Sequence, residues 1–132
     1  MSEKLALFLI SVFFGLGAFF SFYVAPILFK VLEKSQAGAV VERVFPIYFG
    51  LGLILVAIAV LVGKEVGKLF LILGIINLAL LGLELFYMVP TMHKLKQVNY
   101  ELFMKYHGFS MGINLLILLL TLTKAILIIL KR

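Results

Sequence analysis

Long runs of apolar residues alternate with short polar segments along the chain. A helix needs about 20 apolar residues to cross a bilayer, because it rises about 1.5 Å per residue over a hydrocarbon core of roughly 30 Å. Four runs are close to this length, at residues 5–29, 46–62, 69–90 and 108–130. Their apolar residues are nearly continuous rather than alternating, which indicates helices and not the strands of a transmembrane barrel. The pattern predicts four membrane-spanning helices.

The connections between these runs are short, which favours antiparallel neighbours. We therefore predict an all-α fold, an integral membrane up-down-up-down four-helix bundle that forms a single domain over residues 1–132. In the first connection, Ser35 is a candidate N-cap for a short helical stretch. The third connection has apolar residues at helical spacing with lysines between them. That pattern is typical of a helix that continues out of the membrane or lies at its interface.

The composition of the chain agrees with this fold and excludes a soluble domain. The chain is 64% hydrophobic and 14% charged, and a soluble domain of 132 residues could not bury so much apolar surface. We predict a multi-pass protein of a cell membrane, the inner membrane if the source is bacterial, with the lipid bilayer as its partner. The first run exceeds the roughly 7–15 apolar residues of a signal peptide and no convincing small-x-small cleavage site follows it, so we interpret it as a retained helix.

Charge and cysteine content narrow the chemistry. The net charge of +6 lies almost entirely at helix ends, where basic side chains contact lipid headgroups, so we expect no nucleic-acid partner. The absence of cysteine excludes disulfides, thiolate metal sites and cysteine nucleophiles.

The basic residues divide evenly between the two membrane faces, so the positive-inside rule predicts no orientation. The face of the termini carries Lys4, Lys64, Lys68, Lys131, Arg132 and, if it snorkels there, Lys124; the other carries Lys30, Lys34, Arg43, Lys94, Lys96 and Lys105.

Small residues on the first run mark places where helices can meet. Gly17, Ser21 and Ala25 are spaced four apart, and Ser11 and Gly15 form a second pair. Small side chains let helix backbones approach closely in lipid, where dispersion drives association. We expect these faces to support helix packing and a homo-oligomer.

Polar residues form a stripe on each of the last two runs. On the third run Asn77, Glu84 and Thr91 are seven apart and Tyr87 is three beyond Glu84, which predicts one shared helical face. On the fourth run, the residues at helical spacing are His107, Ser110, Met111, Asn114 and Thr121. Glu84 lies six residues before Pro90 and Asn114 six after Gly108, about 9 Å along each helix, so antiparallel packing would place them level.

These stripes predict a polar pocket that opens toward the first and third connections. Its expected members are Glu84, Asn114, His107, Ser110, Asn77, Tyr87 and Tyr48. A carboxylate within a span costs roughly 2.5–3.5 kcal/mol on insertion, so it is usually paired, neutral or functional. Two interpretations remain open. Glu84 either locks helix packing through a contact with Asn114 or Arg43, or it serves a function in the pocket.

The two histidines, His93 and His107, are candidate metal ligands. One histidine from each of two adjacent helix ends can bind heme or copper in a bundle. They are fourteen residues apart across a connection, however, without the i, i+4 spacing of a ligand pair. We find no nucleophile–base pair, phosphate-binding loop or zinc motif, so we expect no catalytic residues.

Three segments carry a family resemblance: "AGAVVERVFPIYFGLG", "YMVPTMHKL" and "FMKYHGFSMGINLL". They resemble the bacterial relatives of transmembrane protein 205, a domain family of unknown function. The strongest match is F-x-x-x-H-G-x-S-x-x-x-N, formed by Phe103, His107, Gly108, Ser110 and Asn114. The second is the aromatic-Pro-x-Tyr sequence formed by Phe45, Pro46 and Tyr48.

The family is similar in layout to the CopD copper-resistance membrane domain and to HemJ, a heme-associated oxidase. These relatives imply metal or tetrapyrrole chemistry. The first run contains no histidine, although HemJ-like proteins carry one there, and this speaks against HemJ-type oxidase activity. The link of transmembrane protein 205 to platinum-drug resistance implies transport or trafficking.

Three hypotheses follow, in order of preference. The first is a membrane protein that binds or transports a small cation, metal or other solute at the Glu84/Asn114 pocket, with protonation of Glu84 coupled to binding. The second is a heme- or copper-linked redox protein that uses His107 and His93. The third is a structural or partner-binding protein in which the polar stripe only specifies helix packing.

Overall fold

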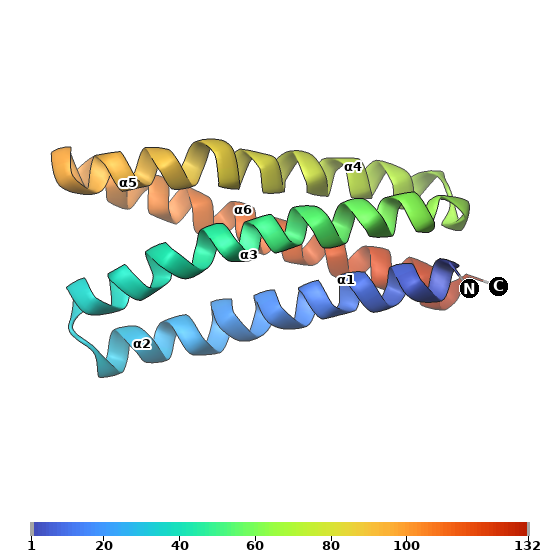
Figure 1. The fold of residues 1–132 in the computed structure, drawn as a ribbon, viewed down its shortest axis with the longest axis horizontal. Helices are drawn as coiled ribbons and strands as arrows, with labels where there is room; N and C mark the ends of the chain where they lie inside the picture. The colour runs from blue at the N-terminus through green and yellow to red at the C-terminus, as the bar shows by residue number, and fades with distance from the viewer. Residues whose placement is uncertain (1, 132) are drawn as a thin grey trace.

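Four long helices lie side by side in the computed structural model, which describes residues 2–131 (Figure 1). Two of these helices contain a π-helical turn, so each is divided into three labelled elements. In chain order the elements are α1 (Ser2–Phe19), η1 (Phe20–Val24), α2 (Ala25–Val31), α3 (Lys34–Val62), η2 (Lys64–Val66), α4 (Lys68–Leu83), η3 (Glu84–Met88), α5 (Val89–Val98) and α6 (Tyr100–Leu130).

The helices alternate in direction along the chain. The two ends of the chain lie at one end of the bundle, where Lys131 Nζ donates a hydrogen bond to Glu3 Oε1 at 2.8 Å (Figure 1). Arg132, counted above on this face, lies outside the described residues. Each of the four helices is long and apolar enough to cross a bilayer. The predicted all-α, up-down-up-down membrane bundle is confirmed.

The helices extend beyond the apolar runs, so the first and third connections are much shorter than predicted. The helical stretch predicted in the first connection is confirmed, but it is longer than expected: it is the beginning of α3, which continues past Pro46 to Val62. Ser35 is not its N-cap, since Glu33 holds that position. In the third connection α5 continues out of the apolar run to Val98. Asn99 then caps α6 by accepting a hydrogen bond from the Leu102 backbone N–H at 3.1 Å.

The two π-helical turns occupy equivalent places in the sequence. η1 and η3 each end two residues before a proline, Pro26 and Pro90 respectively. Proline has no N–H, and its ring clashes with the carbonyl four residues earlier in an α-helix. A π turn uses i→i+5 hydrogen bonds instead, here from Ala25 N–H to the Phe20 carbonyl and from the corresponding amide of Val89 in the other helix. Each turn therefore holds one residue more than an α turn.

This extra residue changes which side chains face the interior after Glu84. Met88 is buried, whereas Tyr87 is 49% exposed and Thr91 is half-buried. The prediction that Tyr87 and Thr91 share the face of Glu84 is wrong, because it assumed an uninterrupted α-helix. The inward positions are shifted one residue along, to Met88 and Met92.

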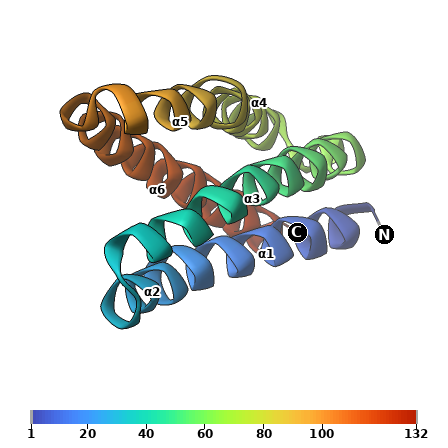
Figure 2. The ribbon, with the colours of Figure 1, turned by 60° about the vertical axis from the view of Figure 1, so that its left-hand side comes forward.

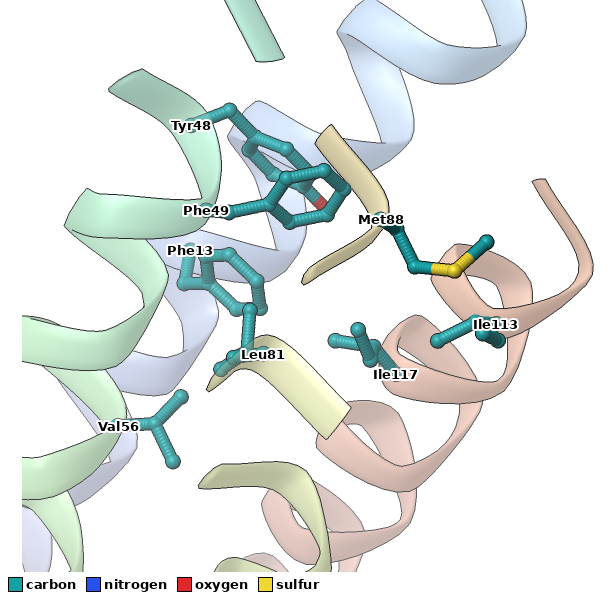
Figure 3. Close-up of a cluster of buried hydrophobic side chains, with 8 residues drawn as sticks. All are labelled: Phe13, Tyr48, Phe49, Val56, Leu81, Met88, Ile113 and Ile117. Carbon is teal, nitrogen blue, oxygen red and sulfur yellow. The ribbon is translucent and has the colours of Figure 1, made fainter. Parts of the chain in front are cut away.

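The largest apolar core lies in the middle of the bundle (Figure 3). Figure 3 shows the aromatic rings of Phe13, Tyr48 and Phe49 gathered on one side and Ile113 and Ile117 on the other. Phe13 and Tyr48 stack with ring centroids 5.3 Å apart. A second core, near the end of the bundle that carries the termini, is formed by Ala6, Ile10, Ala59, Phe70 and Ile128.

Two glycines allow this close packing. A Cβ on Gly17 would lie 2.7 Å from Leu118 Cδ2, and a Cβ on Gly52 would lie 2.6 Å from Phe13 Cε1. Both distances are far below van der Waals contact, so these positions accept only glycine without rearrangement. The small-residue face of the first helix is thus used within the chain. Gly15 and Gly50, by contrast, have open space around them.

Gly52→Ala and Gly50→Ala form a matched pair for testing this packing. We expect Gly52→Ala to destabilise the bundle by about 1–3 kcal/mol, since overpacking forces neighbouring side chains to shift. Gly50→Ala should be neutral or stabilising by up to about 1 kcal/mol, because alanine favours the helix without meeting a neighbour. Unfolding of the detergent-solubilised proteins with increasing SDS measures both. Equal effects of the two substitutions would contradict the packing described.

The bundle is spread at the end opposite the termini. Figures 1 and 2 show α2 and the beginning of α3 diverging there from α5 and the beginning of α6. α2 packs mainly on α3, while α5 packs on α6. The space between these two pairs is where the polar stripes meet.

Candidate functional site

A cavity of about 280 Å³ lies between the two helix pairs, and all four long helices contribute to its walls. Glu84, Ser110, Asn114 and His107 all line it, so four of the seven predicted pocket residues come together. The remaining lining residues are Ser21, Phe22, Ala25, Pro26, Phe29, Val41, Phe45, Phe49, Val89, Met92, Met111 and Leu115.

Glu84 begins the η3 turn and its side chain is fully buried. Ser110 Oγ lies 2.8 Å from both carboxylate oxygens and donates its one proton to them. Neither contact expected from the sequence forms: Ser110, one turn before Asn114, is the partner, and Arg43 is exposed. Within residues 2–131 no basic side chain forms an ion pair with Glu84. The carboxylate therefore faces the cavity with a single hydroxyl as its donor.

Asn114 connects three helices behind this carboxylate. Its Oδ1 accepts a hydrogen bond from the Tyr48 hydroxyl of α3 at 2.8 Å. Its Nδ2 donates to Ser21 Oγ of η1, also at 2.8 Å. Tyr48 thus contributes to the site through Asn114 rather than by lining the cavity. The amide is satisfied by protein groups on both sides and holds the back wall in place.

Two predicted members lie elsewhere. Asn77 is fully buried two turns from Glu84, where its Nδ2 donates to Thr121 Oγ1 at 3.0 Å. Tyr87 lies outside the cavity, and its hydroxyl is 3.2 Å from that of Tyr106. Asn77 joins α4 to α6 below the site, and Tyr87 joins η3 to α6 on the outer surface.

A second cavity of about 420 Å³ lies nearer the Asn99 end of the bundle. Its polar residues include Glu42 of α3, which accepts a hydrogen bond from Lys96 Nζ at 3.2 Å and also pairs with His93 Nδ1. The two cavities share six lining residues and are therefore adjacent: Phe29, Val41, Phe45, Val89, Met92 and His107. His107, half-buried and stacked on Phe103, is the one titratable residue that lines both cavities.

The two candidate metal ligands both line the second cavity. His93 is engaged with Glu42 and its side chain is 65% exposed. In the part of the chain that the structure describes, no three His, Asp or Glu side chains are grouped to hold a metal ion. A metal or heme would thus have two histidines at most from this chain, one of them already paired.

A buried cation lies near the other end of the α4–α6 interface. The Lys124 side chain is fully buried, with Nζ 5.8 Å from the centre of the Phe70 ring. Among residues 2–131 its Nζ has no hydrogen-bond acceptor. Lys124 was counted on the face of the termini only on the condition that it snorkels there; instead, its side chain is buried against Phe70 of α4. The sequence did contain a sign of this burial: Lys124 lies three residues beyond Thr121, on the same face of the helix as Asn114.

The fold and the cavity define a class: a multi-pass membrane protein with four spanning helices around a mainly apolar cavity that contains a buried carboxylate. The family described as "Domain of unknown function (DUF4149)" matches residues 8–101, and the chain belongs to it. An uncharacterised protein of Aquifex aeolicus (strain VF5) is 67% identical over 132 residues, which is all of both chains. No solved structure matches the chain.

Proposed function

We propose that this protein binds, and moves across or within the bilayer, a small cationic solute held at Glu84. The observation that carries this proposal is the carboxylate itself: it is fully buried, faces a cavity and has no basic partner among residues 2–131. A buried ionised carboxylate is costly unless a positive charge compensates it. A bound cation or a proton would supply that charge, so the two would compete for the same oxygens.

The surroundings of Glu84 favour binding over a purely structural role. If Glu84 only locked helix packing, it would need good partners on other helices, as Asn114 has in Tyr48 and Ser21. Instead its only donor is the Ser110 hydroxyl, shared between its two oxygens, and it adjoins a cavity of about 280 Å³. A pocket of this kind, mostly apolar with a few convergent polar groups, is typical of small-molecule sites.

Thermal unfolding of the detergent-purified protein with a panel of cations tests this proposal. The panel contains Na⁺, K⁺, Mn²⁺, tetraethylammonium and benzyltriethylammonium. We expect at least one of them to raise the unfolding temperature of the wild type, since a ligand at 100 times its Kd stabilises by about 2.7 kcal/mol. Glu84→Gln should weaken that binding at least about tenfold, because it removes the compensating charge. Glu65→Gln, at an exposed acid in η2, is the matched control.

Lower pH should weaken binding to the wild type, because protonation of Glu84 removes the charge that holds the cation. Glu84→Gln should bind weakly at every pH. His107 lines the same cavity and also titrates, so His107→Gln must retain the pH dependence if Glu84 is responsible. The proposal fails if no cation stabilises the wild type, or if Glu84→Gln responds as the wild type does.

Three finer assignments remain part of this proposal. They are kinship with the transmembrane protein 205-like family, location in a bacterial inner membrane, and a homo-oligomer. Gly15, Gly50, Gly108 and Gly112 are helical glycines with open space around them, and a second copy could approach closely there. Size-exclusion chromatography with light scattering in detergent measures the subunit number directly.

A further inference from the structure

The walls of the Glu84 cavity restrict the kind of cation that fits, if the proposed function holds. Four aromatic rings face the cavity, those of Phe22, Phe29, Phe45 and Phe49. Inorganic cations such as Ca²⁺ and Mg²⁺ require six or more oxygen ligands, counting waters. The cavity offers the two oxygens of one carboxylate and few others, in a mainly apolar setting. A single positive charge on an apolar body matches these walls better, and ring faces attract such a charge.

The cavity also opens on the lipid-facing surface. Four of its lining residues are themselves large, apolar and exposed: Phe22 by 60%, Met111 by 59%, Leu115 by 46% and Phe29 by 43%. Two come from the first helix and two from α6, so the opening lies between η1/α2 and α6. In a membrane-spanning bundle the exposed apolar side chains of the spans contact acyl chains. α2 packs mainly on α3, which leaves this side of the bundle uncovered.

The cavity also adjoins the second cavity, with which it shares six lining residues. The adjacent second cavity is lined by Lys34, Glu42, His93 and Lys96, near the turns at one end of the bundle. The cavity that holds the buried carboxylate thus has an apolar lateral opening and also adjoins a cavity with charged side chains in its lining. An amphiphilic cation, which partitions into the membrane with its charge near the headgroups, would meet both environments along this path.

We propose that the ligand is an amphiphilic monovalent organic cation that reaches Glu84 from the bilayer through the opening between η1/α2 and α6. The positive group pairs with the carboxylate, which Ser110 orients by its hydrogen bond. The apolar body contacts the aromatic rings. This inference rests on the proposed function and adds the class of substrate and its route.

Titration calorimetry on the protein in lipid nanodiscs tests the substrate class. Benzyltriethylammonium and tetraethylammonium carry the same charge and differ only in that a benzyl group replaces one ethyl group. We expect the benzyl compound to bind about tenfold more tightly or better, through ring burial and contact with the aromatic walls. Its binding should be lost in Glu84→Gln and kept in Glu65→Gln.

The sequence contains no tryptophan, so one introduced tryptophan reports on the opening without background. Phe22→Trp places it at the opening, and Phe8→Trp places it on α1 at a residue that is 63% exposed and lines neither cavity. Lipids brominated on their acyl chains should quench both. Benzyltriethylammonium should change the emission of Phe22→Trp with the half-saturation that calorimetry gives for this same variant, and should leave the emission of Phe8→Trp unchanged.

The outcomes separate this inference from the proposed function. Glu84-dependent binding of Mn²⁺ or tetraethylammonium that equals or exceeds that of benzyltriethylammonium would overturn the substrate class and leave the proposed function standing. Phe22→Trp that is not quenched by brominated lipid, or that does not respond to bound benzyltriethylammonium, would overturn the lateral route. Absence of any Glu84-dependent cation binding would overturn both.

Discussion

Asn114→Leu should be among the most damaging polar substitutions in this protein, with an expected loss of about 2–3 kcal/mol in the free energy of unfolding. Asn114 accepts from the Tyr48 hydroxyl and donates to Ser21, so its loss leaves two hydroxyls unpaired on two other helices. Tyr48 is buried, and water cannot replace the missing acceptor. An unsatisfied buried polar group costs its full desolvation penalty, about 1–3 kcal/mol.

A double-mutant cycle gives this prediction its control. Tyr48→Phe removes the buried hydroxyl that Asn114→Leu would orphan, so the double variant should be less damaged than the sum of the single ones by about 1 kcal/mol. Tyr87→Phe removes a hydroxyl from the exposed Tyr87–Tyr106 pair and should cost less than about 0.5 kcal/mol. SDS unfolding in detergent measures all four variants. Strict additivity of Tyr48→Phe and Asn114→Leu would contradict the hydrogen bond.

Lys124→Met should stabilise the protein, an unusual sign for a substitution in a core. The ammonium group is fully buried and has no acceptor among residues 2–131. Burying an ion costs several kcal/mol even after relaxation, whereas its position near the Phe70 ring returns at most about 2 kcal/mol. Methionine has a similar length and no charge, so we expect a gain of about 1–3 kcal/mol.

Lys68→Met is the matched control for this effect. Lys68 begins α4 at the same end of the bundle and is exposed, so its replacement should change stability by less than about 0.5 kcal/mol. Thermal unfolding in detergent compares both variants with the wild type. A clear loss of stability in Lys124→Met would show that the charge has a partner and would refute this account.

The number, direction and class of the helices could be predicted from the apolar runs alone, because lipid leaves a chain few alternatives. Helix ends were predicted less well. Hydropathy places residues 34–45 and 91–98 in connections because they contain charged residues, although helical stretches are predicted within both connections. They are helical, since apolar residues at helical spacing let these segments pack on their neighbours. Hydropathy predicts which part of a helix lies in lipid, but it does not predict how far the helix extends beyond the lipid.

The sequence predicted where the candidate site lies and some of the residues that line it. Heptad spacing and depth placed Glu84 level with the Ser110–Asn114 stripe, and both line one cavity. The hydrogen-bond partners could not be read from spacing, because a one-turn difference decides whether Ser110 or Asn114 reaches the carboxylate. Ser21 was interpreted only as a small packing residue. Its role as a hydrogen-bond acceptor for Asn114 could be recognised only from the structure, which places η1 against α6.

The π turn at residues 84–88 has a consequence for comparing members of this family. A relative with an ordinary α turn there would need one residue fewer between the positions of Glu84 and Pro90 to keep both in place. An ungapped alignment would then pair Met88 and Met92, which face the interior, with residues that face outward in the relative. Covariation and conservation in this segment are therefore meaningful only when a single-residue gap is allowed within it.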